Sequence, residues 1–206
     1  MNCALIKVCG MREAENIREV AALGIDWLGL IFWPRSKRYV ARRPVYLPEQ
    51  ARRVGVFVDA PAEDILQHIE DYGLDLVQLH GHESPELVRQ LRETAGLPLI
   101  KAFNVATAED FLQTESYAGL TDYFLFDTKG KAVGGNGEKF DWTVLADYHG
   151  ETPFILSGGI GPDDADRVKS FHHPKCIGID LNSRFETAPA LKDVKAIKEF
   201  IKKVRI

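Results

Sequence analysis

Residues 27–32 read Trp-Leu-Gly-Leu-Ile-Phe, a short apolar run that contains no charged side chain. Such a run predicts a strand that is buried on both faces. Seven further short apolar runs with few charges alternate with helix-like stretches along the chain, at residues 4–8, 54–58, 74–79, 98–103, 123–126, 153–156 and 176–181. Eight such units predict a parallel sheet closed into a (β/α)8 TIM barrel with surrounding helices, formed by residues 1–206 as one domain.

Barrels of this kind carry their chemistry at the C-terminal ends of their strands. The residues that follow the eight runs are therefore the first candidates for a functional site. They are Cys9-Gly10, residues 32–38, Asp59, His80-Gly81, Asn104, Asp127, residues 157–159 and Asp180.

Cap residues predict where several helices begin and end. A helix over residues 12–23 should end at Gly24, a second should run from Pro61 to Gly73, a third should begin at Ser84-Pro85, Thr107 and Asp163 should cap two more, and the last should cover residues 191–204. Two long loops, residues 34–48 and the glycine-rich residues 129–139, are expected to act as lids or ligand clamps at the catalytic end.

Composition favours a soluble protein of a reducing cytosol. The formal charge is −4, and the only basic cluster lies in residues 35–43, which is weak support for nucleic-acid binding. No apolar run is long enough to span a bilayer. Three cysteines without a CxxC pair favour neither a metal site nor a disulfide framework, as expected in a reducing cytosol.

Cys9 is the first catalytic candidate. Strand alternation puts Lys7 and Cys9 on one face, so both should point into the barrel. A cation two residues away could lower the pKa of the thiol toward a reactive thiolate. The alternative is a buried cysteine that acts only as a small hydrophobe.

Asp127 is the second candidate, because it ends the sixth run just before the glycine-rich loop. Apolar neighbours would raise the pKa of its carboxyl group and keep it protonated. The alternative is a cap on the following turn. A base and an acid on different sides of a bound substrate suit proton shuttling. His80 shares a strand face with Gln78 and could titrate near neutrality, or it could be a hydrogen-bonded structural histidine.

A phosphate site is expected at the loops after the seventh and eighth strands, the usual place in such barrels. Gly158 and Gly159 follow the seventh run, and they would let the backbone approach an anion. Asn182 and Ser183 follow the eighth run. The alternative for Gly158-Gly159 is a plain tight turn.

An ordered set of motifs along the chain resembles that of a known enzyme family. It comprises Lys7-Val8-Cys9-Gly10, residues 32–39 (FWPRSKRY), 54–58 (VGVFV) and 77–81 (VQLHG), Asp127-Thr128, residues 134–137 (GGNG) and 140–142 (FDW), and residues 156–159 (LSGG). Together these motifs resemble phosphoribosylanthranilate isomerase of tryptophan biosynthesis over nearly the full chain.

The resemblance implies an Amadori rearrangement of N-(5-phosphoribosyl)anthranilate, a small phosphoribosyl substrate, without a cofactor or a metal. In such enzymes the motif cysteine, here Cys9, is the general base that takes the proton from C2. The aspartate at position 127 is the general acid that protonates the ring oxygen, and the arginine at position 38 binds the anthranilate carboxylate. A monomer or a homodimer is expected.

The chain departs from the family after the last strand. The usual Asp-Val-Ser-Ser-Gly-Val-Glu is here Asp-Leu-Asn-Ser-Arg-Phe-Glu at residues 180–186, so Arg184 replaces a glycine. We expect the backbone of Gly159, Asn182 and Ser183 to hold the phosphate. Arg184 should then either aid binding from outside or point outward to pair with an acid such as Glu186.

Two other functions fit a phosphosugar barrel. A histidine-pathway phosphoribosyl isomerase performs the same type of rearrangement, but it would be expected to use aspartates at both strand ends, which Cys9 argues against. A non-catalytic phosphosugar-binding barrel would need neither Cys9 nor Asp127.

Overall fold

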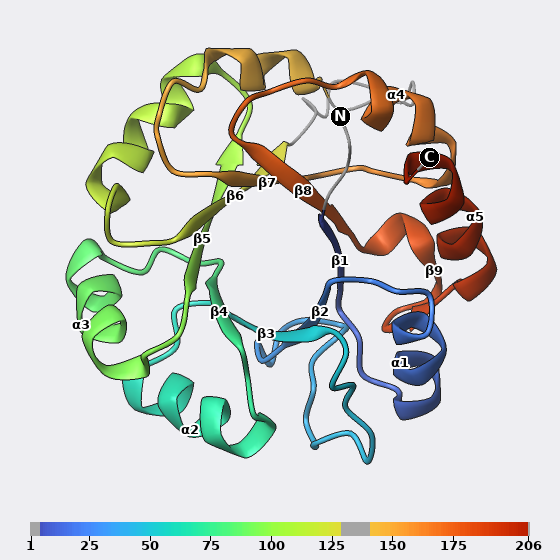
Figure 1. Ribbon diagram of the computed structural model, residues 1–206. Coiled ribbons are helices and arrows are strands. Elements are labelled where there is room, and N and C mark those ends of the chain that lie inside the picture. The colour runs from blue at the N-terminus through green and yellow to red at the C-terminus, as the bar shows by residue number, and fades with distance from the viewer. Residues whose placement is uncertain (1–4, 129–140, 206) are drawn as a thin grey trace.

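The computed structural model describes residues 5–128 and 141–205. Within them, eight strands pair in parallel in chain order and close into a barrel, with β1 bonded to both β2 and β8 (Figure 1). The strands are β1 (Leu5–Cys9), β2 (Trp27–Ile31), β3 (Arg52–Phe57), β4 (Leu76–Leu79), β5 (Leu99–Val105), β6 (Tyr123–Thr128), β7 (Phe154–Ser157) and β8 (Cys176–Leu181). The predicted (β/α)8 barrel is confirmed.

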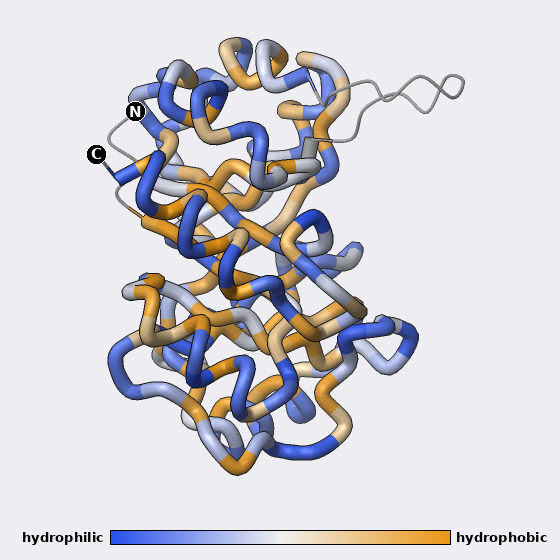
Figure 2. Tube along the Cα trace, turned by 90° about the vertical axis from the view of Figure 1, so that its right-hand side faces the viewer, coloured by the Kyte–Doolittle hydropathy of each residue, from blue (hydrophilic) through white to orange (hydrophobic). Residues whose placement is uncertain are grey.

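Helices surround the strands as an outer ring (Figure 1). The α-helices are α1 (Ala14–Ala21), α2 (Ala62–Tyr72), α3 (Pro85–Ala95), α4 (Ala165–Ser170) and α5 (Val194–Val204), and the 3-10 helices are η1 (Ala108–Tyr117), η2 (Trp142–Asp147), η3 (Pro162–Asp164) and η4 (Ser183–Phe185). Hydrophobic and hydrophilic residues alternate along the outer helices (Figure 2). No helix in the described part of the chain is long and apolar enough to cross a membrane.

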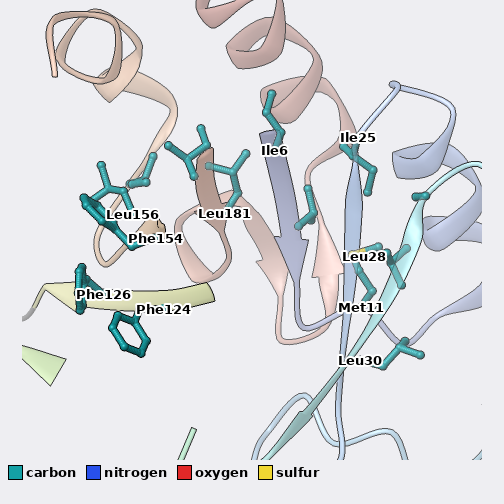
Figure 3. Packing of buried hydrophobic residues seen from close by; sticks show 14 of the residues in the cluster. Ile6, Met11, Ile25, Leu28, Leu30, Phe124, Phe126, Phe154, Leu156 and Leu181 are labelled. Carbon is teal, nitrogen blue, oxygen red and sulfur yellow. The ribbon is translucent and has the colours of Figure 1, made fainter. Parts of the chain in front are cut away.

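Strand alternation divides the core into two layers. Phe124 and Phe126 of β6 point outward and pack in the layer between barrel and helices, where Phe154 of β7 lies beside Phe126 (Figure 3). Leu125, between them in sequence, belongs instead to a smaller cluster inside the barrel, together with Cys9. The barrel interior is therefore packed, and Cys9 lies in that interior layer.

Several predicted helix boundaries are confirmed. The helix α2 follows Pro61 and ends at Gly73, whose φ of 58° lies in the left-handed region that glycine favours. Ser84 caps α3, because its hydroxyl oxygen accepts a hydrogen bond from Leu87 N. Thr107 lies at the N-cap of η1, although this segment is a 3-10 helix and not an α-helix. The predicted end at Gly24 is wrong by two residues, because α1 ends at Ala21 with Ala22 as its C-cap, and Gly24 N donates to Ala21 O in the turn that follows.

Two predicted helix starts are wrong. The last helix begins at Val194 and not at residue 191, because Leu191–Lys192 forms β10, which pairs antiparallel with β9 (Glu186–Ala188). The Asp193 side chain then caps α5 by accepting from Ala196 N at 2.9 Å. Asp163 lies inside η3 and caps no helix, and it is the next residue, Asp164, that accepts from Gly161 N and stands at the N-cap of α4.

The predicted loop over residues 34–48 is confirmed as a stretch without a helix, and β2 is linked to β3 with none between them. The other predicted loop, residues 129–139, lies outside the described residues.

Candidate active site

A cavity of about 320 Å³ opens at the C-terminal end of the barrel. It gathers ten of the residues selected from the sequence: Cys9, His80, Asp127, Ser157, Gly158, Gly159, Asp180, Asn182, Ser183 and Arg184. The other lining residues are Ile31, Val56, Gln78 and Ile160. Seven different strands or their following loops contribute, so closure of the barrel is what brings these distant sequence positions together.

Cys9 is the last residue of β1, and its side chain is buried in the barrel interior as predicted. Lys7, on the same face, is fully buried, and its Nζ donates to Asp180 Oδ1 on β8 at 3.0 Å. Burial raises the pKa of the Cys9 thiol above its ordinary value, although Lys7 and Lys192 act against that rise. Lys7 therefore acts in the predicted direction, but the predicted net lowering of the thiol pKa is wrong, because burial outweighs the lysine and Asp180 adds to the rise.

Lys7 itself remains a cation. Burial, the largest single influence, disfavours its ammonium form, but the neighbouring Asp180 and Cys9 together raise the pKa of Lys7 above 10.5. Ser157 adds a second contact to Asp180, since its hydroxyl lies 3.4 Å from Oδ2. Lys7 and Asp180 thus form a buried ion pair beside the Cys9 thiol.

Asp127 is the fifth residue of β6, and its carboxylate Oδ2 lies 4.0 Å from Nε2 of His80. The amide nitrogen of Gln78 lies 2.8 Å from the other ring nitrogen, Nδ1. An amide nitrogen can only donate, so Nδ1 accepts and the ring proton of a neutral His80 lies on Nε2, facing Asp127. Both His80 and Asp127 are about one-third exposed, which leaves them open to the cavity.

The loop after β7 has the backbone shape expected of a close anion contact. Gly158 and Gly159 have φ angles of 96° and 65°, conformations that strain any residue with a side chain. The short 3-10 helix η4 begins at Ser183 on the neighbouring loop after β8. Both loops face the cavity and could present backbone N–H groups to one ligand.

Arg184 points toward the loop after β7. Its Nη1 donates to Gly159 O at 3.0 Å and lies 3.9 Å from Asp164 Oδ2. The expected alternative, a pair between Arg184 and Glu186, is not what the structure has, because Glu186 binds two other cations. Arg184 is nearly half exposed, with 46 % of its side chain accessible.

Arg38 is not among the residues that line the cavity. Its Nε and Nη2 donate to the two carboxylate oxygens of Glu186, at 2.8 and 2.5 Å. Its stem crosses directly over Gly10, where an added Cβ would lie 2.5 Å from Arg38 Cδ and 2.9 Å from Asn182 Oδ1. The glycine after Cys9 therefore makes room for Arg38 at the rim of the site.

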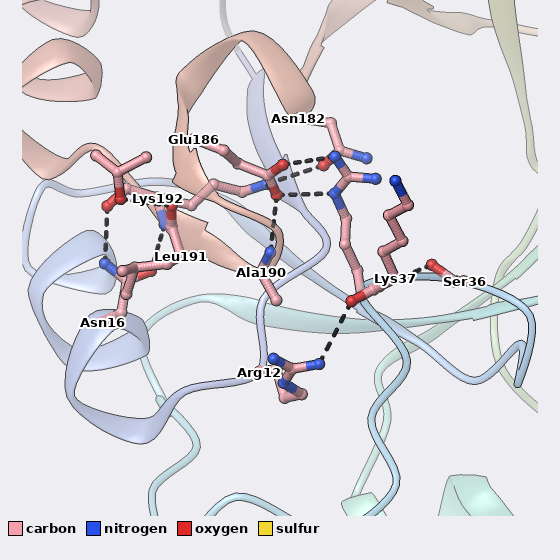
Figure 4. A network of polar contacts seen from close by, with 11 residues as sticks. Arg12, Asn16, Ser36, Lys37, Asn182, Glu186, Ala190, Leu191 and Lys192 are labelled. Atoms are coloured by element: carbon pink, nitrogen blue, oxygen red, sulfur yellow. Dashed lines mark hydrogen bonds and ion pairs between the residues drawn. The ribbon is translucent and has the colours of Figure 1, made fainter.

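Sequence reasoning missed Lys192 and gave Glu186 the wrong partner. Lys192 Nζ donates to Glu186 Oε1 at 2.7 Å and to Asn182 Oδ1 at 2.8 Å (Figure 4). Lys192 was hidden within a predicted helix, where a lysine suits a solvent-exposed face. The β9–β10 hairpin turns the Lys192 side chain into the protein. The neighbouring residues Ala190 and Leu191 do not form a pattern from which this hairpin could be predicted.

A closed parallel barrel with this cavity at the C-terminal ends of its strands places the chain among the (β/α)8-barrel enzymes. The family model for N-(5'phosphoribosyl)anthranilate (PRA) isomerase matches residues 6–203, and the chain belongs to that family. The resemblance drawn from its motifs is confirmed.

Individual relatives agree with this membership. The chain is 52% identical over 208 residues to N-(5'-phosphoribosyl)anthranilate isomerase of Parabacteroides distasonis, covering 97% of this chain and 93% of the relative. The crystal structure of phosphoribosyl anthranilate isomerase from Thermotoga maritima is 33% identical with a TM-score of 0.83. A second such structure, in complex with reduced 1-(o-carboxyphenylamino)-1-deoxyribulose 5-phosphate, is 31% identical with a TM-score of 0.81. Both comparisons cover 98% of each chain.

Proposed function

We propose that this protein catalyses the Amadori rearrangement of N-(5-phosphoribosyl)anthranilate to 1-(2-carboxyphenylamino)-1-deoxyribulose 5-phosphate in tryptophan biosynthesis. The observation that carries the proposal is that Cys9, Asp127 and the Gly158-Gly159 turn line one cavity. A thiol and a carboxylate are groups that can accept and donate protons, and the turn can hold a phosphate. Family membership supports the choice of substrate.

Asp127 is the general acid of the proposal. It protonates the furanose ring oxygen as the bond between that oxygen and C1 breaks, which leaves an open-chain iminium with the anthranilate nitrogen. His80, with Nε2 at 4.0 Å from the carboxylate, is a supporting group that helps to orient Asp127. Gln78 holds the ring of His80 from its other side.

Cys9 is the general base. Its thiolate removes the proton from C2 of the iminium, and the electron pair of the C–H bond neutralises the nitrogen to give an enolamine. Delivery of a proton to C1 and loss of the C2 hydroxyl proton then yield the ketone, so the reaction is an isomerisation. Because burial raises the pKa of the thiol, the cation of Lys7, which acts to lower that pKa, is needed to keep the thiolate accessible.

Arg38 binds the anthranilate carboxylate. A guanidinium carries five N–H donors, and Glu186 engages Nε and Nη2. The edge formed by Nη1 and the second N–H of Nη2 remains for a planar carboxylate, which such an edge can bind through two parallel hydrogen bonds. Glu186 thereby fixes the direction of the fork before substrate arrives.

The phosphate binds chiefly to backbone groups of Gly159, Asn182 and Ser183. Positive φ angles at Gly158 and Gly159 support this choice, since side chains would block close approach there. Arg184 donates to Gly159 O, so it contributes positive charge at the rim of the site and does not bind the phosphate through two direct hydrogen bonds. A thiol base also suits a reducing compartment, and we place the enzyme in the cytoplasm.

The test is an activity assay on the purified protein. The labile substrate is generated in place from anthranilate and phosphoribosyl pyrophosphate with the upstream transferase, and the loss of its fluorescence is followed. The expected result is a loss whose rate increases in proportion to added protein, with a product that shows a ketone carbon signal in its ¹³C NMR spectrum. Fluorescence loss no faster than in the protein-free control would contradict the proposal.

A further inference from the structure

The proposed mechanism leaves one buried charge near the cavity without a role. Lys192 lies on β10 with a fully buried side chain, held by Glu186 and Asn182. Burying an ammonium is expensive unless it is paired. The pairing explains how the lysine is tolerated, but it does not explain why a cation is needed there.

The backbone of Lys192 already anchors the hairpin without help from the side chain. Lys192 N donates to Asn16 Oδ1 at 2.7 Å, and Lys192 O accepts from Asn16 Nδ2 at 2.9 Å (Figure 4). Any residue at this position can make those two bonds with α1. The side chain is therefore free to serve another purpose.

The ammonium of Lys192 contacts two residues that border the site. Its partner Asn182 lines the same cavity as Cys9, and its partner Glu186 holds Arg38, whose stem crosses Gly10. Lys192 is among the groups that act to lower the pKa of the Cys9 thiol. Burial lowers the pKa of Lys192 below its ordinary value of 10.5, and Glu186 and Cys9 act against that fall. The two groups therefore feel each other's charge through the protein.

The charges around Cys9 do not cancel when the thiol is neutral. Four charged groups interact electrostatically with the Cys9 thiol: Lys7 on β1, Asp180 on β8, Lys192 on β10 and Arg38 between β2 and β3. A fifth group, Glu186 on β9, pairs with Lys192 and Arg38. Asp127 and His80 face the same cavity from β6 and β4. Asp127 and His80 are about one-third exposed, so solvent screens them more than the five buried or half-buried groups. Among those five groups three cations stand against two carboxylates, so one positive charge is left over.

We propose that Lys192 is a positioning residue of the reaction: its buried ammonium supplies the surplus charge that a Cys9 thiolate neutralises, and it steadies Glu186 as the partner of Arg38. The role in the reaction rests on the proposed function. Without Lys192 the remaining cations and carboxylates balance, and a thiolate would be an uncompensated buried anion.

The primary test measures the Cys9 thiol without substrate. The rate of alkylation by iodoacetamide is followed against pH, with peptide mass spectrometry to separate Cys9 from Cys3 and Cys176. In Lys192→Met the midpoint for Cys9 should move to higher pH by about one unit, so the rate well below the midpoint falls about tenfold. Lys192→Arg, which keeps the charge, should stay near the wild-type midpoint.

Two further variants guard against a mere loss of stability. Lys101→Met removes another buried lysine, one paired with Glu83 at 3.2 Å, and should leave the Cys9 midpoint unchanged. Glu186→Gln removes a carboxylate and leaves the charge of Lys192 less balanced, so the midpoint should move to lower pH. A general loosening of the fold would not produce shifts of opposite sign.

An unchanged midpoint in Lys192→Met and Glu186→Gln would overturn the proposal, as would equal shifts in Lys192→Met and Lys101→Met. The alkaline shift in Lys192→Met should also appear in the acid limb of kcat/KM for the isomerisation. Absence of isomerase activity in the wild type would instead contradict the proposed function, and the alkylation result would stand apart from it.

Discussion

Replacing Lys7 by methionine should destabilise the barrel strongly. Methionine fills much of the same volume, but among the described residues it leaves the buried carboxylate of Asp180 with the Ser157 hydroxyl alone, at 3.4 Å. Removing one partner of a buried ion pair costs about 3–5 kcal/mol. For a chain of this size that corresponds to a fall in Tm of about 6–20 °C.

The double variant Lys7→Met/Asp180→Asn separates the pair from the packing. With both charges removed, no uncompensated ion remains in the interior, so the double variant should recover most of the lost stability. Equilibrium urea unfolding of the wild type, both single variants and the double variant gives the coupling energy, which should be about 2–4 kcal/mol, within the range for such cycles or slightly above it.

The pH of that experiment follows from the sign of the Lys7 shift. The folded-state pKa of Lys7 lies above its ordinary value of 10.5, so the stability from its charge is fully present below that value. It is lost only as pH rises through the folded-state pKa. Measurements near pH 7.5 therefore see the whole effect. A cost below about 1 kcal/mol for Lys7→Met, or strict additivity in the cycle, would refute the reasoning.

Three substitutions test the other assigned roles. Asp127→Asn should lower kcat by about 10²–10⁴-fold, because an amide cannot protonate the ring oxygen; near-normal steady-state turnover would remove Asp127 as the acid. Arg38→Lys should raise KM about tenfold and change kcat much less, since lysine keeps the charge but loses the fork; an unchanged KM would show that Arg38 does not bind the carboxylate. Arg184→Ala should weaken product binding, measured by calorimetry, by less than about tenfold and make binding less dependent on salt; a loss of about a hundredfold, near 2.7 kcal/mol, would make Arg184 a primary phosphate ligand.

The barrel and most of the cavity could be predicted because they depend on strand order. Once eight strands close in sequence, the residue at each C-terminal strand end has to face one opening. Cys9, Asp127 and Asp180 lie far apart in the chain, yet each was placed correctly by that rule alone. The inward direction of Lys7 followed in the same way from alternation along β1.

The electrostatics of the site could not be predicted, because they depend on which charges pair. From sequence, Lys7 was the nearest cation to Cys9, and the expected effect was a lower thiol pKa. Burial of the thiol in the barrel interior outweighs the lysine, and Asp180, which the structure places against Lys7, adds to the rise in the thiol pKa. Lys7 is aligned with Asp180 by the register between β1 and β8, which depends on tertiary structure and cannot be read from the sequence.

The same limit explains the rim of the site. The last segment was predicted as one continuous helix from residue 191, since Val194, Ile197 and Ile201 recur at helical spacing. Pairing of Leu191–Lys192 with β9 interrupts the helix and buries Lys192 beside Glu186. A two-residue strand leaves no periodic pattern, so neither the hairpin nor the lysine could be recognised from sequence.

The most direct measurement of the central claim compares the wild type with Cys9→Ala in the fluorescence assay, using the same in situ substrate. Circular dichroism and urea unfolding of both proteins establish that the variant is folded. A general base contributes about 10²–10⁴-fold, and alanine cannot accept a proton, so kcat/KM should fall by at least about a hundredfold. A folded Cys9→Ala protein that consumes substrate within about threefold of the wild-type rate would contradict the assignment of Cys9 as the base.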